Sequence, residues 1–232
     1  MEPMDMTSAN GKDMACDVVI AGCGVAGLYA ALNLPEDMQI VMLSKGRVDE
    51  CDSMLAQGGI CVLPEGDDYE AFFTDTLRAG HNENRRESVD IMIRSSRTVI
   101  NDLLALGVDF ERKADGSLDF TREGAHSCPR IAFHADITGK EITTKLLDAV
   151  RRLPNVKILE HVAMVDILLE SRDGVDTCAG VVAVPVTEEA SLDPADELSG
   201  TLGKSADGAA APFNIRATHT LWACGGIGGL YQ

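Results

Sequence analysis

A glycine-rich turn between an apolar strand and a helix constrains the fold of this chain more than any other segment. Residues 18–20 are Val-Val-Ile, a β-branched run typical of a strand buried on both faces of a parallel sheet. Gly22, Gly24 and Gly27 follow with the spacing G-x-G-x-x-G, and residues 28–32 have helical character. In such a motif the glycines permit a tight turn, close approach of a pyrophosphate, and close packing of helix on strand. The N-terminus of the helix would favour the negative charge of that pyrophosphate.

The residues after this turn favour a dinucleotide-binding fold but argue against NAD. Alone, the glycine hexapeptide also occurs in ordinary turns of α/β proteins. Here a second apolar strand is predicted over residues 38–43, within one βαβ unit. NAD-binding chains place an acidic residue after this strand to bind a ribose hydroxyl, whereas this chain has Ser44 and Lys45. Serine contacts a ribose more weakly and lysine suits a phosphate, so an NAD-dependent dehydrogenase is the less favoured alternative.

Composition describes an ordinary globular protein and excludes several classes of partner. The chain has 232 residues, of which 45% are hydrophobic and 25% charged, enough for one large domain or slightly more. Its formal net charge of −17 would repel nucleic acid and anionic membrane surfaces. No apolar run approaches the ~20 residues that span a bilayer. Residues 1–16 lack the apolar core of a signal peptide, and we expect them to form a flexible tail.

The cysteines indicate neither a metal site nor a disulfide framework. Seven of them are scattered along the chain without a C-x-x-C pair. Zinc sites and disulfide-stabilised domains both need closer or more regular spacing. Free thiols in a reducing compartment are the simplest interpretation. We therefore predict a cytoplasmic protein without a bound metal ion.

The remaining pattern predicts an α/β domain with an added β-meander. A long functional loop is expected over residues 46–64, and a hairpin turn at Asp115-Gly116. Thr138 and Glu141 form a capping-box pattern at the start of a helix. Helices are predicted over residues 67–79, 86–106 and 138–152, and further strands over residues 156–159, 162–169, 181–186, 213–215 and 219–223. Residues 187–212 are rich in acidic and small residues and are expected to be an exposed loop.

Six motifs occur along the chain in the order found in one group of flavoproteins. They are Gly22-x-Gly24-x-x-Gly27, Ser44-Lys45-Gly46, Ala56-Gln57-Gly58-Gly59-Ile60, Thr121-Arg122-Glu123-Gly124, His134-Ala135-Asp136-x-Thr138-Gly139 and Gly225-Gly226. From residue 17 to residue 232 the chain resembles the L-aspartate oxidases, which belong to the succinate dehydrogenase and fumarate reductase flavoprotein superfamily. The Thr-Arg-Glu-Gly stretch favours the aspartate oxidases within that superfamily.

The resemblance implies a Rossmann-like FAD-binding domain over residues 17–232, with a central parallel sheet, helices on both faces and an additional β-meander. It also implies where FAD would bind. The pyrophosphate would lie on Gly22, Cys23, Gly24, Val25, Ala26 and Gly27. The adenosine would contact Ser44 and Lys45, and the adenine would lie near Ala163. The pyrophosphate and the flavin ring would lie along Asp52, Ser53, Met54, Leu55, Ala56, Gln57, Gly58 and Gly59, and Gly225 and Gly226 would form a second glycine-rich turn at the site.

The resemblance further implies that FAD is bound without a covalent bond. Flavoproteins of the respiratory complexes link the flavin to a histidine five residues before the glutamine of this Ala-Gln-Gly-Gly motif. The glutamine here is Gln57, so the corresponding position is Asp52. A carboxylate at that position cannot form the histidyl link.

The implied reaction is oxidation of L-aspartate to iminoaspartate, with oxygen or fumarate as the electron acceptor. The product would feed quinolinate synthase in NAD biosynthesis. Glu123 would bind the substrate ammonium through a charge-assisted hydrogen bond. The alternative is a structural ion pair of Glu123 with Arg122 or Arg130. We interpret His126 and His134 as structural hydrogen-bonding groups rather than bases.

The chain also departs from the family pattern. Gly124-Ala125 stands where two glycines are usual, and Cys224 replaces a threonine. The family's capping domain, with the arginine and histidines that bind substrate carboxylates and move the proton, would follow residue 232. We therefore expect this chain to be incomplete as an enzyme. The remaining alternatives are a fumarate reductase or succinate oxidase, against which Glu123 argues, and a non-catalytic FAD-binding fragment.

Overall fold

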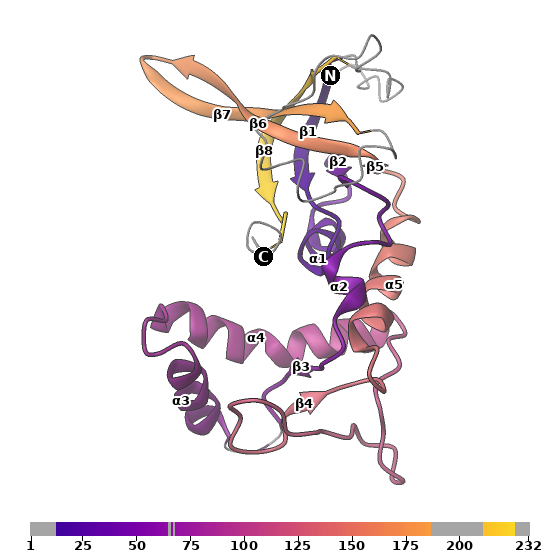
Figure 1. Ribbon diagram of the computed structural model, residues 1–232, viewed down its shortest axis with the longest axis vertical. Coiled ribbons are helices and arrows are strands. Elements are labelled where there is room, and N and C mark those ends of the chain that lie inside the picture. The colour runs from indigo at the N-terminus through magenta and orange to yellow at the C-terminus, as the bar shows by residue number, and fades with distance from the viewer. Residues whose placement is uncertain (1–12, 65, 67, 187–210, 226–232) are drawn as a thin grey trace, which may run out of the picture. The chain divides into compact units, whose positions relative to one another are not determined.

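The computed structural model describes residues 13–64, 66, 68–186 and 211–225. The chain divides into two compact units (Figure 1). Unit 1 combines the residues up to Asp52 with those from Leu147 onward, and unit 2 is the intervening segment Ser53–Leu146.

Unit 1 is built on a sheet whose strand order is β5-β2-β1-β8-β7-β6. Its strands are β1 (Met14–Ala21), β2 (Ile40–Leu43), β5 (Val156–Leu159), β6 (Val162–Arg172), β7 (Val175–Pro185) and β8 (Phe213–Trp222). β1 pairs in parallel with β2 and β8, and β2 pairs in parallel with β5. β7 pairs antiparallel with both β6 and β8. The Rossmann-like parallel sheet and the added meander are confirmed.

Helix α1 (Val25–Asn33) is the crossover between β1 and β2, as the βαβ pattern predicts. It packs on the face of the sheet that carries Ile20, whose Cγ2 lies 3.3 Å from the position that a Cβ of Gly27 would take. Leu28 and Ala31 of this helix are buried. The strand and the helix therefore meet at the glycine, because no side chain separates them.

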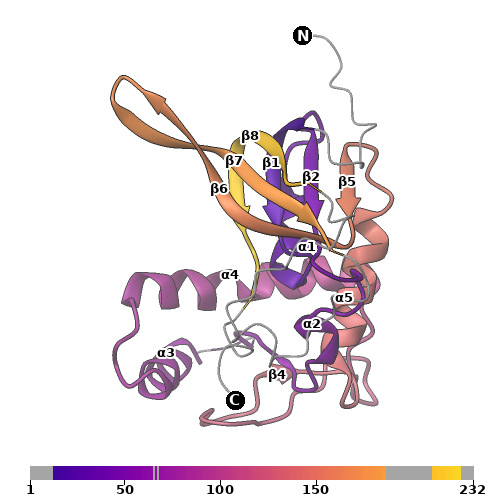
Figure 2. The same ribbon diagram turned by 45° about the horizontal axis from the view of Figure 1, so that its top comes forward.

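The opposite face of the parallel strands is covered by the meander, and Figure 2 shows β6 and β7 crossing in front of β1 and β2. The hydrophobic cluster on this face consists of residues from the strands of the sheet. Its members include Val19, Val41, Leu43, Leu159, Val162, Val181, Ala183, Phe213 and Ile215. The Rossmann-like class holds, but strands rather than helices cover this face, because β6 and β7 supply the apolar side chains.

Unit 2 is mainly helical. It contains most of α2 (Asp52–Leu55), all of α3 (Tyr69–Ala79) and α4 (Arg86–Ala105), and the first part of α5 (Thr138–Val150). A small antiparallel sheet pairs β3 (Ile60–Cys61) with β4 (Ile131–Ala132). The core between α3 and α4 is formed by Phe72, Leu77, Val89 and Ile93. In α4 the apolar residues Val89, Ile93, Ile100 and Leu103 are buried at helical spacing, whereas Met92 is 47% exposed.

Several local predictions need correction. β1 begins at Met14, inside the expected tail, because Met14 and Cys16 are buried in the core; residues 1–12 lie outside the described part of the chain. β8 is one strand rather than two, because it pairs with β1 from Ile215 to Trp222. The segment 46–64 contains α2 and β3. The expected hairpin around Asp115-Gly116 turns as predicted but has a single bridge, between Arg112 and Leu118.

The capping-box interpretation at α5 is wrong. The hydroxyl of Thr138 accepts the backbone N–H of His134 at 2.8 Å. The carboxylate of Glu141 accepts the backbone N–H of Asp109 at 3.0 Å. The two side chains therefore tie α5 to the loop before it and do not cap the helix reciprocally. Of the expected acidic loop 187–212, all but its last two residues lie outside the described residues.

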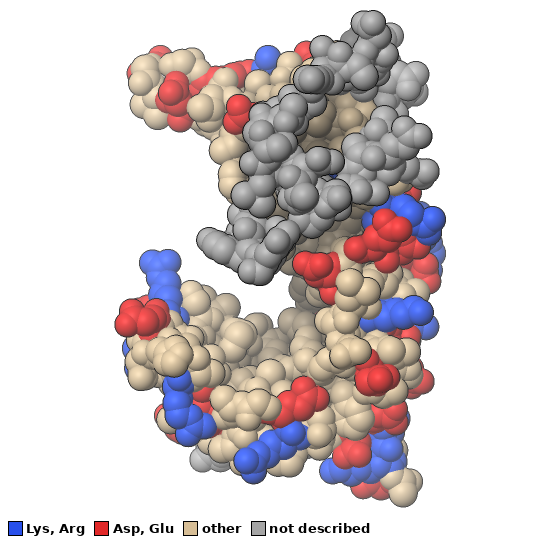
Figure 3. Space-filling model, in the orientation of Figure 1, with Lys and Arg blue, Asp and Glu red and all other residues tan. Residues whose placement is uncertain are grey.

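The surface carries charges of both signs. On the face drawn in Figure 3, Lys and Arg side chains are interspersed with Asp and Glu. Exposed ion pairs of the described residues include Arg47–Asp49 and Arg94–Asp90, both with an N–O distance of 2.8 Å. None of the helices in the described residues has the length and apolar character to cross a membrane.

The close packing of α1 on β1 gives a stability prediction. A Cβ on Gly27 would lie 2.1 Å from the carbonyl oxygen of Gly22, a backbone atom that cannot move away alone. We expect Gly27→Ala to lower the free energy of unfolding by about 3 kcal/mol, measured by urea denaturation. Gly46→Ala is the matched control, since its Cβ would meet only Glu50 Oε2 at 3.5 Å. Equal losses in the two variants would contradict this account.

Candidate functional site

The glycine-rich turn of unit 1 lies between the ends of three parallel strands. Gly22 has a φ of 110°, in the left-handed region that favours glycine. Its N–H donates to the carbonyl oxygen of Leu43 at the end of β2, with an N–O distance of 2.9 Å. A Cβ at Gly22 would lie 2.1 Å from the carbonyl oxygen of Ala223, directly after β8. Backbone conformation and close approach therefore both require glycine at this position.

The start of α1 has the properties of an anion site. Gly24 is the N-cap residue and offers no side-chain cap, and the first turn of this helix contains no acidic side chain. A helix N-terminus presents backbone N–H groups and the positive end of the helix dipole. Val25 and Ala26 belong to this first turn. This turn, which has no room for a Cβ at Gly22, fits a pyrophosphate group.

Cys23, between two of the glycines, is a structural residue. Its side chain is buried, and its thiol donates to the carbonyl oxygen of Leu43 at 3.5 Å. Burial raises the pKa of the Cys23 thiol to about 12, so the thiol is neutral at physiological pH. The backbone of Cys23, rather than its sulfur, is therefore the part that can face a ligand.

The residues after β2 lie at the same edge of the sheet as the glycine-rich turn. Ser44 is buried; its N–H donates to the carbonyl oxygen of Leu159, and its own carbonyl oxygen accepts the N–H of Val162, both at 2.9 Å. Ala163, the next residue of β6, is thereby brought close to Ser44 in unit 1. Lys45 is exposed. The structure thus brings together the predicted adenosine and adenine residues.

The second glycine-rich turn begins directly after β8. Gly225 has a φ of 82°, and Gly226 lies outside the described residues. The thiol of Cys224 donates to the carbonyl oxygen of Ala21 at 3.4 Å, which ties this turn to the end of β1. Cys224 is thus accommodated where the family has threonine.

In unit 2 the Ala-Gln-Gly-Gly motif connects α2 to β3. Ala56, Gln57 and Gly58 are exposed. The N–H of Gly139, at the start of α5, donates to the carbonyl oxygen of Ala56 at 2.9 Å. A Cβ on Gly59 would lie 2.4 Å from the carbonyl oxygen of Ala132, so the motif packs tightly against β4. Contacts with Gly139 and Ala132, both far from this motif in the sequence, therefore hold the exposed backbone of residues 56–58 in place.

Glu123 lies beside this exposed backbone. Its Oε2 is 3.1 Å from the position that a Cβ of Gly58 would take. Among the described residues, no Lys or Arg forms an ion pair with Glu123, because Arg130 pairs with Asp68 and Asp75 instead. The structural ion pair considered as the alternative is therefore not found in this part of the chain. The carboxylate is exposed and faces the motif that the family resemblance predicts to lie along the flavin ring.

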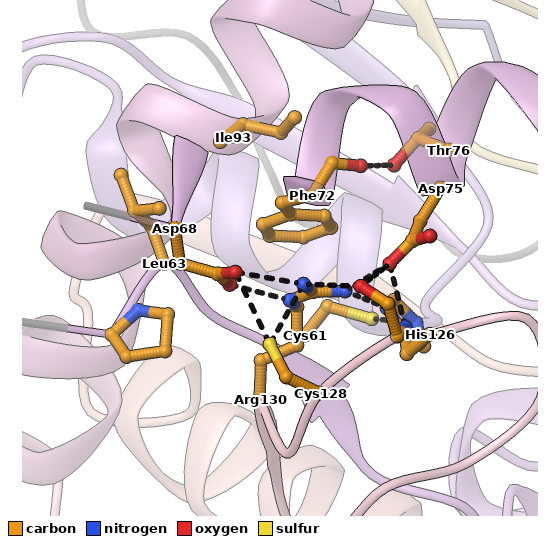
Figure 4. A network of polar contacts seen from close by, with 12 residues as sticks. Cys61, Leu63, Asp68, Phe72, Asp75, Thr76, Ile93, His126, Cys128 and Arg130 are labelled. Carbon is orange, nitrogen blue, oxygen red and sulfur yellow. Dashed lines mark hydrogen bonds and ion pairs between the residues drawn. The ribbon is translucent and has the colours of Figure 1, made fainter. Parts of the chain in front are cut away.

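The structure also contains a buried charged network that the sequence analysis missed (Figure 4). Arg130 is 0% exposed. Its Nε donates to Asp68 Oδ2 at 2.7 Å, and its NH1 group donates to Asp75 Oδ2 at 2.8 Å. Burial raises the pKa of Asp75, but hydrogen bonds from Ser127 and Arg130 outweigh it and hold the pKa well below its ordinary value. The one available signal was Asp75 on the apolar face of α3, because buried acids need a partner.

His126 joins this network as a neutral side chain. Its Nδ1 lies 2.9 Å from the NH1 group of Arg130, and its Nε2 lies 3.2 Å from Cys61 Sγ. Since arginine can only donate, Nδ1 must accept and Nε2 carries the proton. Burial and the positive charge of Arg130 lower the pKa of His126. A ring nitrogen of His134 contacts the carbonyl oxygen of Asp109.

Three further observations concern the expectations from sequence. Ala125, where the family has glycine, is not among the described residues with positive φ, so its methyl group causes no strain of that kind. The seven cysteines are free thiols. Within the described ranges, no group of three or more His, Cys, Asp or Glu side chains is placed to hold a metal ion.

Comparisons with known proteins match these features. The family model described as "FAD binding domain" matches residues 17–232. The L-aspartate oxidase of Clostridium perfringens is 51% identical over 151 residues, which are 65% of this chain and 34% of that protein. The L-aspartate oxidase of Clostridium acetobutylicum is 37% identical over 216 residues, which are 93% of this chain and 44% of that protein.

Solved structures give the same result for the fold. The E. coli quinol fumarate reductase FrdA with an E245Q mutation superposes with a TM-score of 0.79 at 25% identity, over 95% of this chain and 34% of that chain. Mycobacterium smegmatis Sdh1 superposes with a TM-score of 0.74 at 21% identity, over 94% of this chain and 35% of that chain. The chain spans less than half the length of these relatives.

The neutral His126 predicts a pH dependence of stability. Unfolding exposes His126 and returns its pKa to about 6.5, above its folded value. The unfolded chain therefore binds the proton first, so the stabilisation is fully present above about pH 6.5 and is lost as pH falls toward the folded pKa. We expect His126→Asn, which cannot titrate, to flatten the fall in unfolding free energy between about pH 7.5 and pH 5.5.

The control for this experiment is His81→Asn. His81 is exposed with a φ of 53°, which asparagine also adopts readily. The charged groups that face His126 are Arg130, Asp75, Asp68 and Glu123, and both variants leave them unchanged. If the slope of unfolding free energy against pH is the same in both variants, His126 is not the group responsible.

Proposed function

The chain belongs to the FAD binding domain family of flavoproteins, and on this premise we propose that it is the FAD-binding part of an L-aspartate oxidase. FAD is the cofactor of this family, and the glycine turn of unit 1 fits its pyrophosphate. The observation that most directly supports the proposed substrate is the Glu123 carboxylate beside Gly58, which has no cationic partner among the described residues.

The residues of unit 1 would hold the nucleotide part of FAD. Backbone N–H groups of residues 22–27 would bind the pyrophosphate at the start of α1. Ser44 and Lys45 would contact the adenosine, and the backbone at Ala163 the adenine. Residues 52–59 would run along the pyrophosphate and the flavin ring, and Gly225 and Gly226 would complete the site. When bound, FAD supplies the acceptor for a hydride.

Glu123 would select the amine of the substrate. A carboxylate that accepts a hydrogen bond from an ammonium contributes about 1.5–3 kcal/mol, more than a neutral hydrogen bond does. L-aspartate carries that ammonium, whereas succinate and fumarate do not. The same carboxylate would repel the carboxylates of those dicarboxylates, so one residue would favour aspartate in two ways.

The reaction would oxidise L-aspartate to an imine. L-aspartate would lose a hydride from Cα and a proton from its ammonium group, to give protonated iminoaspartate. Oxygen or fumarate would be the final electron acceptor, and quinolinate synthase would use the product for NAD biosynthesis in the cytoplasm. The groups that bind the substrate carboxylates and move the proton would belong to a capping domain beyond residue 232.

A fumarate reductase or succinate oxidase is the second candidate. The superposition with the fumarate reductase FrdA favours it. The 51% identity to an L-aspartate oxidase and the position of Glu123 favour the first candidate. Aspartate-dependent formation of hydrogen peroxide by the full-length protein separates the two.

Noncovalent binding of FAD is directly testable. Asp52 stands at the first residue of α2, where the respiratory enzymes would need a histidine. We expect acid precipitation of the flavin-loaded protein to release all the FAD into the supernatant, measured by its fluorescence. Flavin fluorescence that stays with the precipitated polypeptide would show a covalent link and overturn this assignment.

The role of Glu123 is tested by Glu123→Gln in the full-length protein. The substitution keeps the shape of the side chain and removes its charge. We expect kcat/KM for aspartate to fall by roughly one to two orders of magnitude, because the ammonium loses its charged partner. Fumarate reduction should hold steady or improve, since a repulsive neighbour is removed.

The control for this variant is Glu87→Gln, an exposed glutamate in the first turn of α4. It changes the net charge equally and should leave both reactions unchanged. Equal losses of aspartate oxidation and fumarate reduction in Glu123→Gln, with less bound flavin, would instead indicate a structural role for Glu123.

A further inference from the structure

Glu123 lies on a loop that apolar packing does not hold in place. Residues 121–131 form this loop, and its ends are joined by hydrogen bonds in both directions between Thr121 and Ile131, at 3.0 and 3.1 Å. Between these ends only Arg130 is buried. Gly124, next to Glu123, has a φ of 52°. Because the loop buries almost no apolar surface, polar contacts must determine where Glu123 lies.

One turn of helix α3 provides those contacts. Asp75 Oδ2 accepts the backbone N–H of Ser127 at 2.7 Å and its hydroxyl at 2.6 Å. Arg78 donates to the carbonyl oxygen of Ala125 at 2.9 Å and to Asp75 Oδ1 at 3.0 Å. The loop is therefore held at Ala125 and Ser127, two and four residues beyond Glu123.

The charges of the network indicate why Asp75 is present. Asp68 already forms a bidentate pair with Arg130, from Nε at 2.7 Å and from the NH2 group at 3.0 Å. One carboxylate balances one guanidinium, so Asp75 is a further acid beside Arg130. Its side chain is only 5% exposed, against 18% for Asp68. Burying it is costly unless it is well hydrogen-bonded. Two of its hydrogen bonds go to Ser127, on the loop that carries Glu123.

We propose that Asp75 and Arg78 are positioning residues, which fix the 121–131 loop so that Glu123 is held beside Gly58 to receive a substrate ammonium. This inference rests on the proposed function. Neither residue touches the substrate; both act through the backbone at residues 125–127. Loosening the loop would therefore weaken recognition of an amino dicarboxylate but not of a dicarboxylate without the amine.

The main test is Arg78→Met in the full-length, flavin-loaded protein. The Arg78 side chain is 65% exposed, so its loss should leave the fold intact. We expect kcat/KM for aspartate oxidation to fall by about 10-fold, and fumarate reduction to change by less than about 2-fold. Arg78→Lys should recover part of the loss, since lysine can donate to the carbonyl oxygen of Ala125.

Arg94→Met is the matched control. Arg94 is also 65% exposed and also pairs with an aspartate on its own helix, but it contacts neither the loop nor Glu123. Both reactions should be unchanged in this variant. A fall in aspartate oxidation as large as that of Arg78→Met would show that any lost surface ion pair has this effect, and would overturn the proposal.

A double-mutant cycle separates positioning of Glu123 from other effects. If Arg78 acts through Glu123, Arg78→Met should have no further effect on aspartate oxidation in the Glu123→Gln background. Additive losses would overturn the proposal. If Glu123→Gln alone leaves the ratio of the two reactions unchanged, the proposed function fails, and this inference about amine recognition fails with it.

Amide hydrogen exchange tests the loop without using activity. Arg78→Met and Asp75→Asn should both increase exchange in residues 122–128, while Arg94→Met should not. Asp75→Asn keeps an oxygen that can accept from Ser127 but lacks the charge that Arg130 needs, so it is the more disruptive variant. Unchanged exchange in Arg78→Met would show that α3 does not fix the loop, whatever the kinetics show.

Discussion

The lack of space for a side chain at Gly22 is the constraint on which unit 1 depends. β1 ends between β2 and β8, and the backbone of Gly22 donates to one neighbour and lies against a carbonyl oxygen of the other. The chain then enters α1, which packs closely on β1 because Gly27 has no side chain. The parallel sheet can therefore present three strand ends and a helix N-terminus at one edge. That edge is where a pyrophosphate is best stabilised, because backbone N–H groups and the helix dipole face it.

Unit 2 combines an apolar core with a network of charged side chains. Its helices α3 and α4 pack through an ordinary apolar core, and Phe72 contributes to it. Asp75 of helix α3, which is buried, and Asp68, the N-cap residue of the same helix, face the loop containing Arg130 (Figure 4). Arg130 also lies over the ring of Phe72, 4.9 Å from its centroid. A guanidinium can stack on a ring and donate in its own plane at once, so Arg130 joins the apolar core to the polar loop.

Much of the fold could be predicted from local patterns, and much of the network could not. β1, α1 and α4 follow from glycine spacing and apolar periodicity, which are properties of short segments. The continuity of β8 depends on pairing with β1, about 200 residues away. The polar residues of β8 interrupt the apolar pattern, so the sequence predicted two short strands instead of one. Thr138 and Glu141 have the residue types of a capping box, but they bond to His134 and Asp109. Arg130 meets Asp68 and Asp75 across 62 and 55 residues, a distance over which sequence patterns carry no signal.

In the proposed role of Glu123, selecting an amine requires a charge in one place, and this would explain why unit 2 contains a buried charged network. Apolar packing is non-directional, and a loop with one buried residue has little of it. Hydrogen bonds to charged groups are directional, and a fully bonded Asp75 keeps its charge despite burial. The network therefore need not add to stability overall, since replacing buried charges by apolar groups is often neutral or stabilising. What apolar residues could not supply is a fixed position for the backbone at Ala125 and Ser127, and with it a fixed position for Glu123.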